Sequence, residues 1–362
     1  MRVIISGGGT GGHVYPAIAI ANSLSEKGVK DILFVGAKGK LEMEKVPKAG
    51  YPIEGLDIQG FHRKKMWRNV MFPFRLIGSL LKSRKIIDKF GPDIVVGVGG
   101  YASGSVLRVA QSRGIPTVLQ EQNSLPGVTN KWLAKKATQI FVAYPDMDRF
   151  FDSDKILITG NPVRNDLLDE SGLREEAMRH FGLDSKKKTI FITGGSLGAR
   201  QINKAVAAQE SVLKESDCQL IWQVGKIYHE EYATHPLAHL PQVKLLSFVD
   251  RMDLAYAAAD VVVCRAGALT LSELMIVGKP CVLVPSPNVA EDHQTKNAMA
   301  LVNNQAGKLV KDEEAHIKMI PEALVLLNDV AMQKLYSDNI RKMAAPEAAS
   351  TIADSIIKIV QK

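Results

Sequence analysis

The chain has 362 residues, of which 46% are apolar and 6% aromatic, and its formal net charge is +8 at pH 7. This length can bury the cores of two domains, the low aromatic content argues against a β-sandwich, and the positive charge favours anionic partners. Cys218, Cys264 and Cys281 lack the spacing of a disulfide framework or a zinc site, and no apolar run reaches the ~20 residues of a membrane-spanning helix.

Short β-rich runs alternate with longer amphipathic segments, which is the pattern of a parallel, doubly wound sheet. In the first half, the predicted strands are Val3–Ile5, Ile32–Val35, Ile94–Val96, Thr117–Gln120 and Gln139–Val142. A stretch of chain breakers from Thr159 to Arg164 predicts a domain boundary. The alternation then restarts, with predicted strands at Thr189–Thr193, Leu220–Val224, Val243–Phe248, Val261–Cys264 and Cys281–Pro285.

We therefore predict an α/β chain with two Rossmann-like, doubly wound domains that face each other across a cleft. The predicted domains are residues 1–163 and 164–345. A final helix, about 346–362, carries apolar residues on one side and is expected to pack back on the first domain. The amino-terminal residues lead directly into a strand, without the apolar core of a signal peptide, so we expect a cytoplasmic protein.

Three glycine-rich turns follow predicted strands, at residues 7–12, 97–100 and 194–195. Glycine has no Cβ atom, so backbone N–H groups at such turns can approach an anion closely, with a helix N-terminus behind them. One such turn is equally well explained as a strand-to-helix connection without a ligand. Three in one chain favour binding of phosphate or sugar groups.

The first turn matches the dinucleotide fingerprint G-x-G-x-x-G through Gly7, Gly9 and Gly12. An NAD site also needs an acidic residue on the ribose, about 20 residues further on at the end of the second strand. Here the strand Ile32–Val35 continues into Gly36-Ala37-Lys38. The missing carboxylate argues against an NAD-dependent oxidoreductase.

A series of motifs runs through the whole chain in a fixed order. These are Gly8-Gly9-Thr10-Gly11-Gly12-His13, Gly99-Gly100-Tyr101 with Gly104, Glu121-Gln122-Asn123, Gly194 to Ala199, Cys264 to Thr270, Ser272-Glu273, and Asp292-His293-Gln294 to Asn297-Ala298. In residues and order they resemble the MurG family of glycosyltransferases. The resemblance implies a GT-B fold and an inverting transfer of GlcNAc from UDP-GlcNAc to the 4-hydroxyl of MurNAc in lipid I, giving lipid II for peptidoglycan synthesis.

The resemblance also implies a set of donor-binding residues. They are Thr10, Gly11, Gly12, Asn123, Arg164, Gly195, Ser196, Val249, Ala268, Leu269, Thr270, Glu273 and Gln294. Amides at Gly194-Gly195-Ser196, in a turn expected to open a helix, can meet the diphosphate together with Arg164. Glu273 suits the ribose hydroxyls, Gln294 suits the sugar hydroxyls, and the backbone of Val249 matches the family's uracil contact. A surface arginine at a hinge and a first-turn glutamate that complements the helix dipole are the alternatives for Arg164 and Glu273.

An inverting transfer needs a base for the acceptor hydroxyl, and His13, with an ordinary pKa near ~6.5, is one candidate. Glu121 or a water relay competes for this role, with Asn123 as a hydrogen-bonding group beside the reacting centre. For His13 a structural role in capping its own loop is the alternative. The acceptor, with its own diphosphate, is expected at Gly12, His13, Gly100, Tyr101 and Gly104.

Asp146-Met147-Asp148 and Asp152-Ser153-Asp154 both match D-x-D, the pattern by which another class of glycosyltransferase holds a divalent metal ion. They lie late in the first domain, away from the expected donor loop. We interpret them as capping and solvated residues. We expect no required cofactor, and Mg²⁺ only as a non-obligatory ion.

A basic, apolar segment extends from Phe61 to Lys85. Cations interleaved with aromatic residues favour an anionic membrane surface, and no RNA-recognition motif accompanies them, so we expect no nucleic acid partner. Leu76, Leu80 and Ile87 are predicted core positions. The predicted membrane-contacting residues are Trp67, Arg68, Met71, Phe72, Phe74 and Arg75. The expected location is the cytoplasmic face of the bacterial cell membrane, as a peripheral protein associated with other cell-wall synthesis proteins.

Two other functions remain open from the sequence. A UDP-GlcNAc epimerase, or a GT-B transferase with a soluble acceptor, would have no need of the surface from Phe61 to Lys85. A non-catalytic nucleotide binder at the membrane surface would bind UDP-GlcNAc without turnover.

Overall fold

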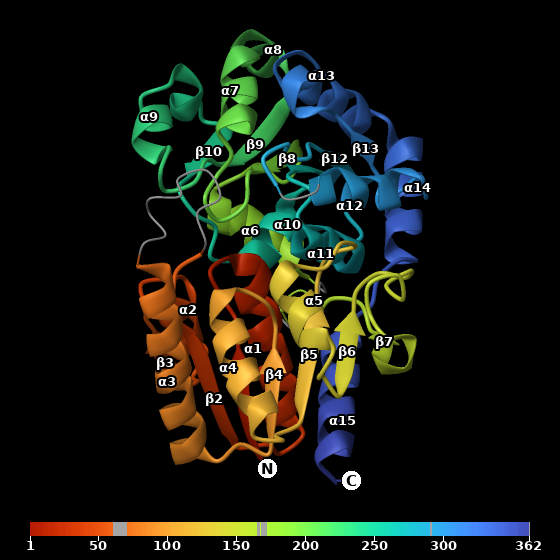
Figure 1. Cartoon of the computed structure of the whole chain (residues 1–362). Coiled ribbons are helices and arrows are strands. Elements are labelled where there is room, and N and C mark those ends of the chain that lie inside the picture. The colour runs from red at the N-terminus through yellow and green to blue at the C-terminus, as the bar shows by residue number, and fades with distance from the viewer. Residues whose placement is uncertain (61–70, 165–166, 168–171, 290–291, 362) are drawn as a thin grey trace. The chain divides into compact units, whose positions relative to one another are not determined.

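The computed structural model describes residues 1–60, 71–164, 167, 172–289 and 292–361 (Figure 1). The chain divides into two compact units. Unit 1 contains Met1–Arg164 and Ala345–Lys362, and unit 2 contains Asn165–Ala344. The predicted membrane-contacting residues Trp67 and Arg68 lie outside the described residues.

Unit 1 is built on a parallel sheet whose strand order is β3-β2-β1-β4-β5-β6-β7. Its strands are β1 (Arg2–Ser6), β2 (Asp31–Ala37), β3 (Ile53–Leu56), β4 (Ile94–Gly97), β5 (Thr117–Glu121), β6 (Gln139–Val142) and β7 (Ile156–Ile158). Its helices are α1 (Gly11–Glu26), α2 (Glu42–Lys48), α3 (Phe72–Phe90), α4 (Tyr101–Ser112), α5 (Val128–Ala134) and α15 (Ala348–Gln361).

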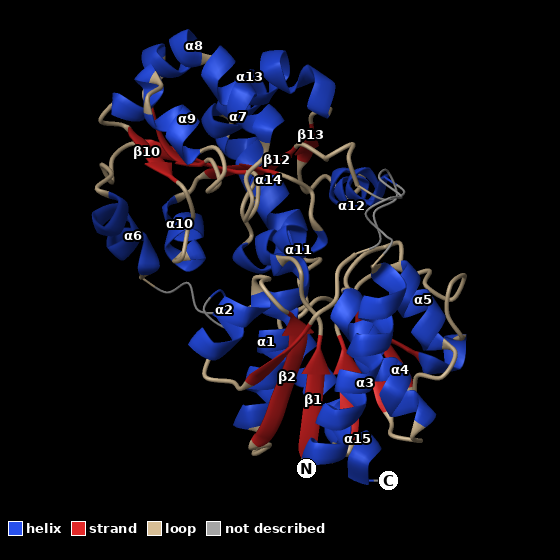
Figure 2. Ribbon diagram, turned by 60° about the vertical axis from the view of Figure 1, so that its left-hand side comes forward, coloured by secondary structure: helices blue, strands red, loops and turns tan. Residues whose placement is uncertain are grey.

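Helices cover both faces of this sheet, as Figures 1 and 2 show. Ile4 of β1 faces a cluster made with α3, α4 and α5, whereas its neighbours Val3 and Ile5 face a cluster made with α1, α2 and α15. Because both faces are buried, the strands are apolar at successive positions rather than at alternate ones. Ile352 and Ile356 of α15 are fully buried in the second cluster, which attaches the end of the chain to unit 1.

Unit 2 repeats this plan with a parallel sheet in the order β10-β9-β8-β11-β12-β13. Its strands are β8 (Lys188–Thr193), β9 (Cys218–Gln223), β10 (Val243–Leu246), β11 (Val261–Cys264), β12 (Cys281–Leu283) and β13 (Lys308–Leu309). Its α-helices are α6 (Leu173–Phe181), α7 (Arg200–Ala208), α8 (Glu210–Glu215), α9 (His229–Ala233), α10 (Met252–Ala258), α11 (Ala268–Val277), α12 (His293–Val302), α13 (Ala315–Asn328) and α14 (Val330–Arg341).

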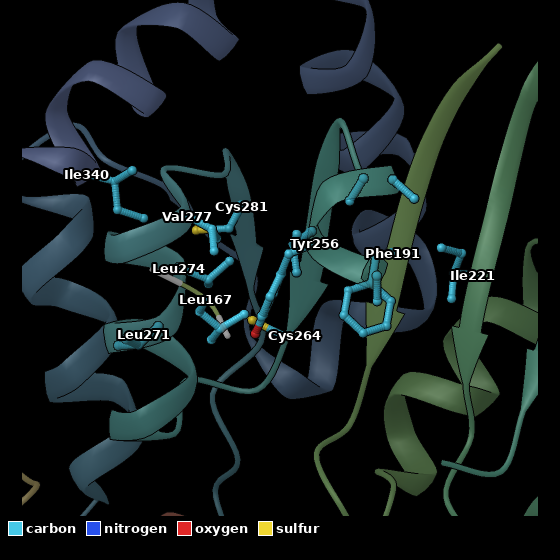
Figure 3. Close-up of a cluster of buried hydrophobic side chains, with 14 of the residues drawn as sticks. Leu167, Phe191, Ile221, Tyr256, Cys264, Leu271, Leu274, Val277, Cys281 and Ile340 are labelled. Carbon is cyan, nitrogen blue, oxygen red and sulfur yellow. The ribbon is translucent and has the colours of Figure 1, made fainter. Parts of the chain in front are cut away.

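One core layer of unit 2 lies between this sheet and helices α6, α10, α11, α12 and α14 (Figure 3). Phe191 of β8 and Tyr256 of α10 pack edge to face there, with ring centroids 5.8 Å apart. Cys264 and Cys281 lie in the same layer as free, buried thiols, and burial raises the pKa of both. The predicted fold class, two parallel α/β sheets, is confirmed.

Candidate active site

The first glycine turn, Gly7 to Thr10, connects β1 to α1 and packs backbone to backbone against the turn after β4. A Cβ atom on Gly7 would lie 2.2 Å from a methyl group of Val98, and one on Gly100 would lie 2.5 Å from the carbonyl oxygen of Gly8. Gly9, Gly99 and Gly100 also have positive φ angles near 90°. Both the contact and the backbone conformation therefore require glycine.

His13 lies in the first turn of α1, directly after this glycine turn. Its Nδ1 atom is 3.2 Å from Thr10 Oγ1, and a Cβ atom on Gly99 would lie 2.8 Å from its Nε2 atom. Burial of the ring lowers the pKa of His13 below 6.5, and a hydrogen bond to the backbone of Gly8 partly opposes this. The imidazole is therefore neutral at pH 7 and able to accept a proton.

Glu121 ends β5, and both of its carboxylate oxygens accept hydrogen bonds within unit 1. Oε1 accepts from the backbone and side-chain amides of Asn123, at 3.1 and 3.3 Å. Oε2 accepts from the backbone of Gly127 at 3.1 Å and from Asn130 at 2.8 Å. Burial raises the pKa of Glu121, and these hydrogen bonds oppose the shift. This arrangement suits a carboxylate that shapes the loop around Asn123 better than one that exchanges protons with a substrate.

A buried network of amide side chains connects the second glycine turn with Asn161, near the end of the first segment of unit 1. Gln122 donates to the carbonyl oxygen of Val98 at 2.8 Å and to the side chain of Gln120. Gln120 donates to Asn161 Oδ1 at 2.9 Å, and Asn161 donates to the carbonyl oxygen of Gln122 at 3.1 Å. The network fixes the strand ends that carry Gly99 and Asn123.

Three of the residues expected to bind the acceptor, Gly100, Tyr101 and Gly104, lie at the start of α4. Gly100 is the residue before the helix, and its carbonyl oxygen accepts a hydrogen bond from Ser103. Tyr101 is 54% exposed, and its ring lies against Gly60, where a Cβ atom would approach it to 2.4 Å. Gly104 faces Thr129. The start of α4 therefore adjoins the first glycine turn, since Gly99 lies against the His13 ring and Gly100 against Gly8.

Arg164 is the last residue of the first segment of unit 1. Its guanidinium lies over the ring of Tyr15, 4.4 Å from the ring centroid. Tyr15 in turn contacts Gly11. A stacked guanidinium keeps its donors in a fixed plane, as bidentate binding of phosphate requires.

The glycine turn of unit 2 follows β8 and is a tight loop held by backbone packing. A Cβ atom on Gly198 would lie 2.0 Å from the carbonyl oxygen of Val224, and Gly195 accepts a hydrogen bond from Gln223 at 3.0 Å. The expectation that Gly194 to Ser196 opens a helix is wrong, because the loop continues to Ala199 and α7 begins at Arg200. Gly194 packs closely against Ala199 and Gly198 against Val224, and this close packing holds residues 194–199 in a loop.

Glu273 lies in α11, which begins at Ala268 after the turn at Gly267. Its position is therefore past the first turn, so the helix-dipole alternative considered for it does not hold. The side chain is buried at 5% exposure, and its Oε2 atom accepts a hydrogen bond of 2.9 Å from the Tyr256 hydroxyl. In the first turn of α11, Ala268 and Leu269 are buried and Thr270 is half-buried.

Two further expected donor residues lie in unit 2. Gln294, in the first turn of α12, accepts a hydrogen bond of 2.8 Å from the backbone of Ser286 through Oε1. The side chain of Val249 is buried in the core beside α10, which leaves its backbone as the group for a ligand. Arg265, which sequence reasoning did not select, donates to the carbonyl oxygens of Val284 and Pro285 and pairs with Asp312.

The two D-x-D segments lie before β7. Asp152 pairs with Lys155 at 3.5 Å. Among the described residues, no group of three or more His, Cys, Asp or Glu side chains is arranged to hold a metal ion.

The part of the basic, apolar segment that the structure describes forms α3. Met71 and Phe74 are 55% and 68% exposed, whereas Phe72 and Arg75 are half-buried. Ile77 and Leu81, which sequence reasoning did not select, are 57% and 58% exposed on the same helix. The predicted core positions are confirmed, since Leu76 and Leu80 pack against the core and Ile87 is fully within it. None of the described helices is long and apolar enough to cross a membrane.

Glu42 and Tyr256 are the main site residues that sequence reasoning missed. Glu42 accepts hydrogen bonds from the first glycine turn, and Tyr256 from α10 orients Glu273. In the sequence, Glu42 looks like an ordinary glutamate in the first turn of a helix. Tyr256 looks like a residue on the apolar face of a short helix. Their roles depend on contacts between elements distant in the chain.

Comparison with known proteins shows which family has this sequence and fold. The glycosyltransferase family 28 N-terminal domain matches residues 3–142, and the family's C-terminal domain matches residues 189–355. The UDP-N-acetylglucosamine–N-acetylmuramyl-(pentapeptide) pyrophosphoryl-undecaprenol N-acetylglucosamine transferase of Flavobacterium psychrophilum is 55% identical over 99% of this chain and 98% of its own length.

Solved structures show the same fold. A crystal structure of MurG from Acinetobacter baumannii is 28% identical, covers 99% of both chains and superimposes with a TM-score of 0.74. A UDP-GlcNAc 2-epimerase from Neisseria meningitidis, bound to UDP-GlcNAc, reaches a TM-score of 0.71 at 13% identity and covers 99% of this chain and 100% of its own. At that identity, the epimerase shows a shared fold alone.

Proposed function

Because this chain belongs to glycosyltransferase family 28, and within it to the MurG transferases, we propose that it transfers GlcNAc from UDP-GlcNAc to lipid I, giving lipid II. The observation that carries this proposal is the 55% identity to a named transferase over 99% of the chain. The epimerase alternative has only fold-level similarity behind it.

We propose that unit 2 binds the donor. The amide and hydroxyl of Ser196 would stabilise the charge that develops on the leaving UDP, since the Gly195 amide already donates to Thr193 Oγ1 at 3.1 Å. The family resemblance adds Arg164 as a further diphosphate contact. Glu273, oriented by Tyr256, would accept hydrogen bonds from the ribose hydroxyls. Gln294 would contact the sugar hydroxyls, and the Val249 backbone would meet the uracil. The first turn of α11, with Ala268, Leu269 and Thr270, completes the proposed donor site.

We propose that His13 is the general base. The oxygen of the MurNAc 4-hydroxyl would bond to C1 of GlcNAc while the bond from C1 to the UDP oxygen breaks and UDP takes the electron pair. The hydroxyl proton would pass to the imidazole of His13, which its lowered pKa keeps neutral at pH 7. Glu121 would instead hold Asn123 in place, since four donors already occupy its two oxygens.

The acceptor would bind unit 1 around the turn before α4, where Gly99 lies against the His13 ring and Gly100 against Gly8. Gly12, Tyr101 and Gly104 would complete this acceptor site. Phe74, Ile77 and Leu81 of α3, together with Met71 directly before it, would contact the membrane that carries the lipid tail. These exposed side chains support peripheral association with a membrane, and the cytoplasmic face is part of the proposal. No metal ion is needed in this scheme, because Ser196 and Arg164 balance the diphosphate charge.

Turnover with both substrates tests the proposal. The purified chain is incubated with UDP-GlcNAc and a lipid I analogue, and UDP release and the disaccharide product are measured together. Equal amounts of both, with no UDP release when the analogue is omitted, are expected. Conversion of UDP-GlcNAc without acceptor would support an epimerase or a hydrolase, and binding without turnover would support a non-catalytic role.

A further inference from the structure

A buried carboxylate lies beneath the first glycine turn. Glu42 begins α2 and is 1% exposed. Its Oε2 atom accepts a hydrogen bond of 2.8 Å from the backbone of Gly9, and its Oε1 atom accepts one of 2.9 Å from the backbone of Ala37 at the end of β2. The side chain therefore joins the first glycine turn to the second strand.

Two glycines make room for this carboxylate. A Cβ atom on Gly8 would lie 2.2 Å from Glu42 Cδ and Oε1, and one on Gly36 would lie 2.5 Å from Glu42 Cγ. Neither distance is compatible with any other residue type unless Glu42 moves. The glycines at positions 8 and 36 and the carboxylate at position 42 thus form one fitted unit.

The Glu42 carboxylate accepts a hydrogen bond that, in phosphate-binding glycine turns, goes to a phosphate. A glycine turn before a helix usually offers its amides to an external anion. Here the amide of Gly9 donates to Glu42, an anion of the chain itself. A dinucleotide site would have a carboxylate at the end of β2 that binds the ribose. Here the carboxylate next to the end of β2 is that of Glu42, and it binds the protein's own glycine turn.

Gly8 connects the Glu42–Gly9 hydrogen bond to His13. The backbone of Gly8 hydrogen-bonds to the His13 ring, and its carbonyl oxygen packs against Gly100. The Gly8-Gly9 peptide is therefore held by Glu42, by the acceptor-side loop and by the imidazole. Any shift of this peptide moves the ring of His13 relative to Gly100.

We propose that Glu42 is a positioning residue that fixes the first glycine turn and thereby places His13 for proton transfer. The inference rests on the proposed transferase function. Because the proposed ribose and sugar contacts, Glu273 and Gln294, lie in unit 2, loss of Glu42 acts mainly on kcat. Thr10, Gly11 and Gly12 are also expected donor residues, so a smaller rise in the KM for UDP-GlcNAc accompanies it. Misplacement of a catalytic group by a fraction of an ångström to one ångström costs about 10- to 100-fold in rate.

Glu42→Gln tests this, because it keeps the shape of the side chain but turns one acceptor oxygen into a donor that faces a backbone N–H. We expect kcat to fall about 10- to 100-fold, with the KM for UDP-GlcNAc within about twofold of the parent. The acid limb of the pH–rate profile should move toward the ordinary histidine value, since a loosened loop admits water to the ring. Glu44→Gln is the matched control, because Glu44 is a half-exposed residue of the same helix, paired with Lys48.

Two measurements keep the result interpretable. Hydrogen exchange of the peptide that contains Gly9 should accelerate in Glu42→Gln and not in Glu44→Gln, whatever the activity. Glu42→Ala should regain part of its kcat when acetate or formate fills the vacated space. Unchanged kcat in Glu42→Gln, or unchanged exchange at Gly9, would overturn the inference. A parent chain without turnover would overturn the proposed function instead, while the exchange result still tests the anchoring of the loop.

Discussion

The hydroxyl of Tyr256 donates a hydrogen bond of 2.9 Å to Oε2 of Glu273 across the core of unit 2. Tyr256 is 1% exposed and cannot turn away, because its ring packs edge to face on Phe191 of the central strand β8. The carboxylate therefore has one oxygen fixed by the protein. If Glu273 binds the ribose, its orientation is set before the donor arrives.

Tyr256→Phe should accordingly weaken donor binding. Loss of one hydrogen bond to a charged group costs about 1.5–3 kcal/mol, so we expect the KM for UDP-GlcNAc to rise by about 10- to 150-fold with little change in kcat. Glu273→Ala should raise it further. Initial-rate kinetics with varied UDP-GlcNAc gives both values. Tyr232→Phe, a buried tyrosine in the opposite core layer, is the control, and a KM in Tyr256→Phe equal to that of the control would refute the role.

The pH–rate profile separates His13 from Glu121 as the base. Burial lowers the pKa of His13, so the neutral, active form persists down to below pH 6.5, and kcat/KM should be level from pH 8 to 6.5 and fall at lower pH. His13→Ala should depress kcat and remove this acid limb. Glu121→Gln should keep the limb.

Circular dichroism over the same pH range gives the control for this profile. A histidine whose folded pKa lies below its unfolded value stabilises the fold less as pH drops below 6.5, so unfolding has to be distinguished from loss of the base. An acid limb that disappears in Glu121→Gln and stays in His13→Ala would reverse the assignment.

Glu121→Gln should also destabilise unit 1. The carboxylate accepts from four donors, and an amide in its place faces at least one backbone N–H with another donor. A buried, unsatisfied group costs about 1–3 kcal/mol, which should appear as a lower Tm of the unfolding transition of unit 1 in calorimetry. Glu54→Gln changes a half-exposed carboxylate paired with Lys82 and should leave Tm nearly unchanged. Equal Tm values for the two variants would show that the Glu121 contacts contribute little.

Most of the fold could be predicted because β-rich runs and glycine turns are local signals. The three strands that were not predicted, β3, β7 and β13, are short: β3 contains Glu54 and Gly55, β7 has three residues and β13 has two. The turn after β8 looked like a helix start, but the packing of Gly198 on Val224 keeps it open. Glu42 and Tyr256 had no local signal, since what defines each is a partner from another element.

Chelation should not abolish activity. The proposed site places Ser196 and Arg164 at the diphosphate, and Asp152 of the D-x-D segments pairs with Lys155 instead. We therefore expect UDP release in excess EDTA to stay within about twofold of that in buffer, a change well below the roughly 100- to 1000-fold that loss of one charge-stabilising group costs. Activity that vanishes in EDTA and returns with Mg²⁺ or Mn²⁺ would overturn the expectation of a metal-independent reaction.

The exposed side chains of α3 should determine binding to anionic membranes. Phe74 and Ile77 are 68% and 57% exposed, and burial of one large apolar side chain contributes about 1.5–3 kcal/mol. Phe74→Ser and Ile77→Ser should each weaken sedimentation with vesicles of phosphatidylglycerol about 10-fold or more, without loss of kcat toward a soluble lipid I analogue. Ile158→Ser is the matched control, because Ile158 is 60% exposed on β7 of the same unit. Vesicle binding that is unchanged in the α3 variants, or reduced equally in the control, would place the membrane contact elsewhere.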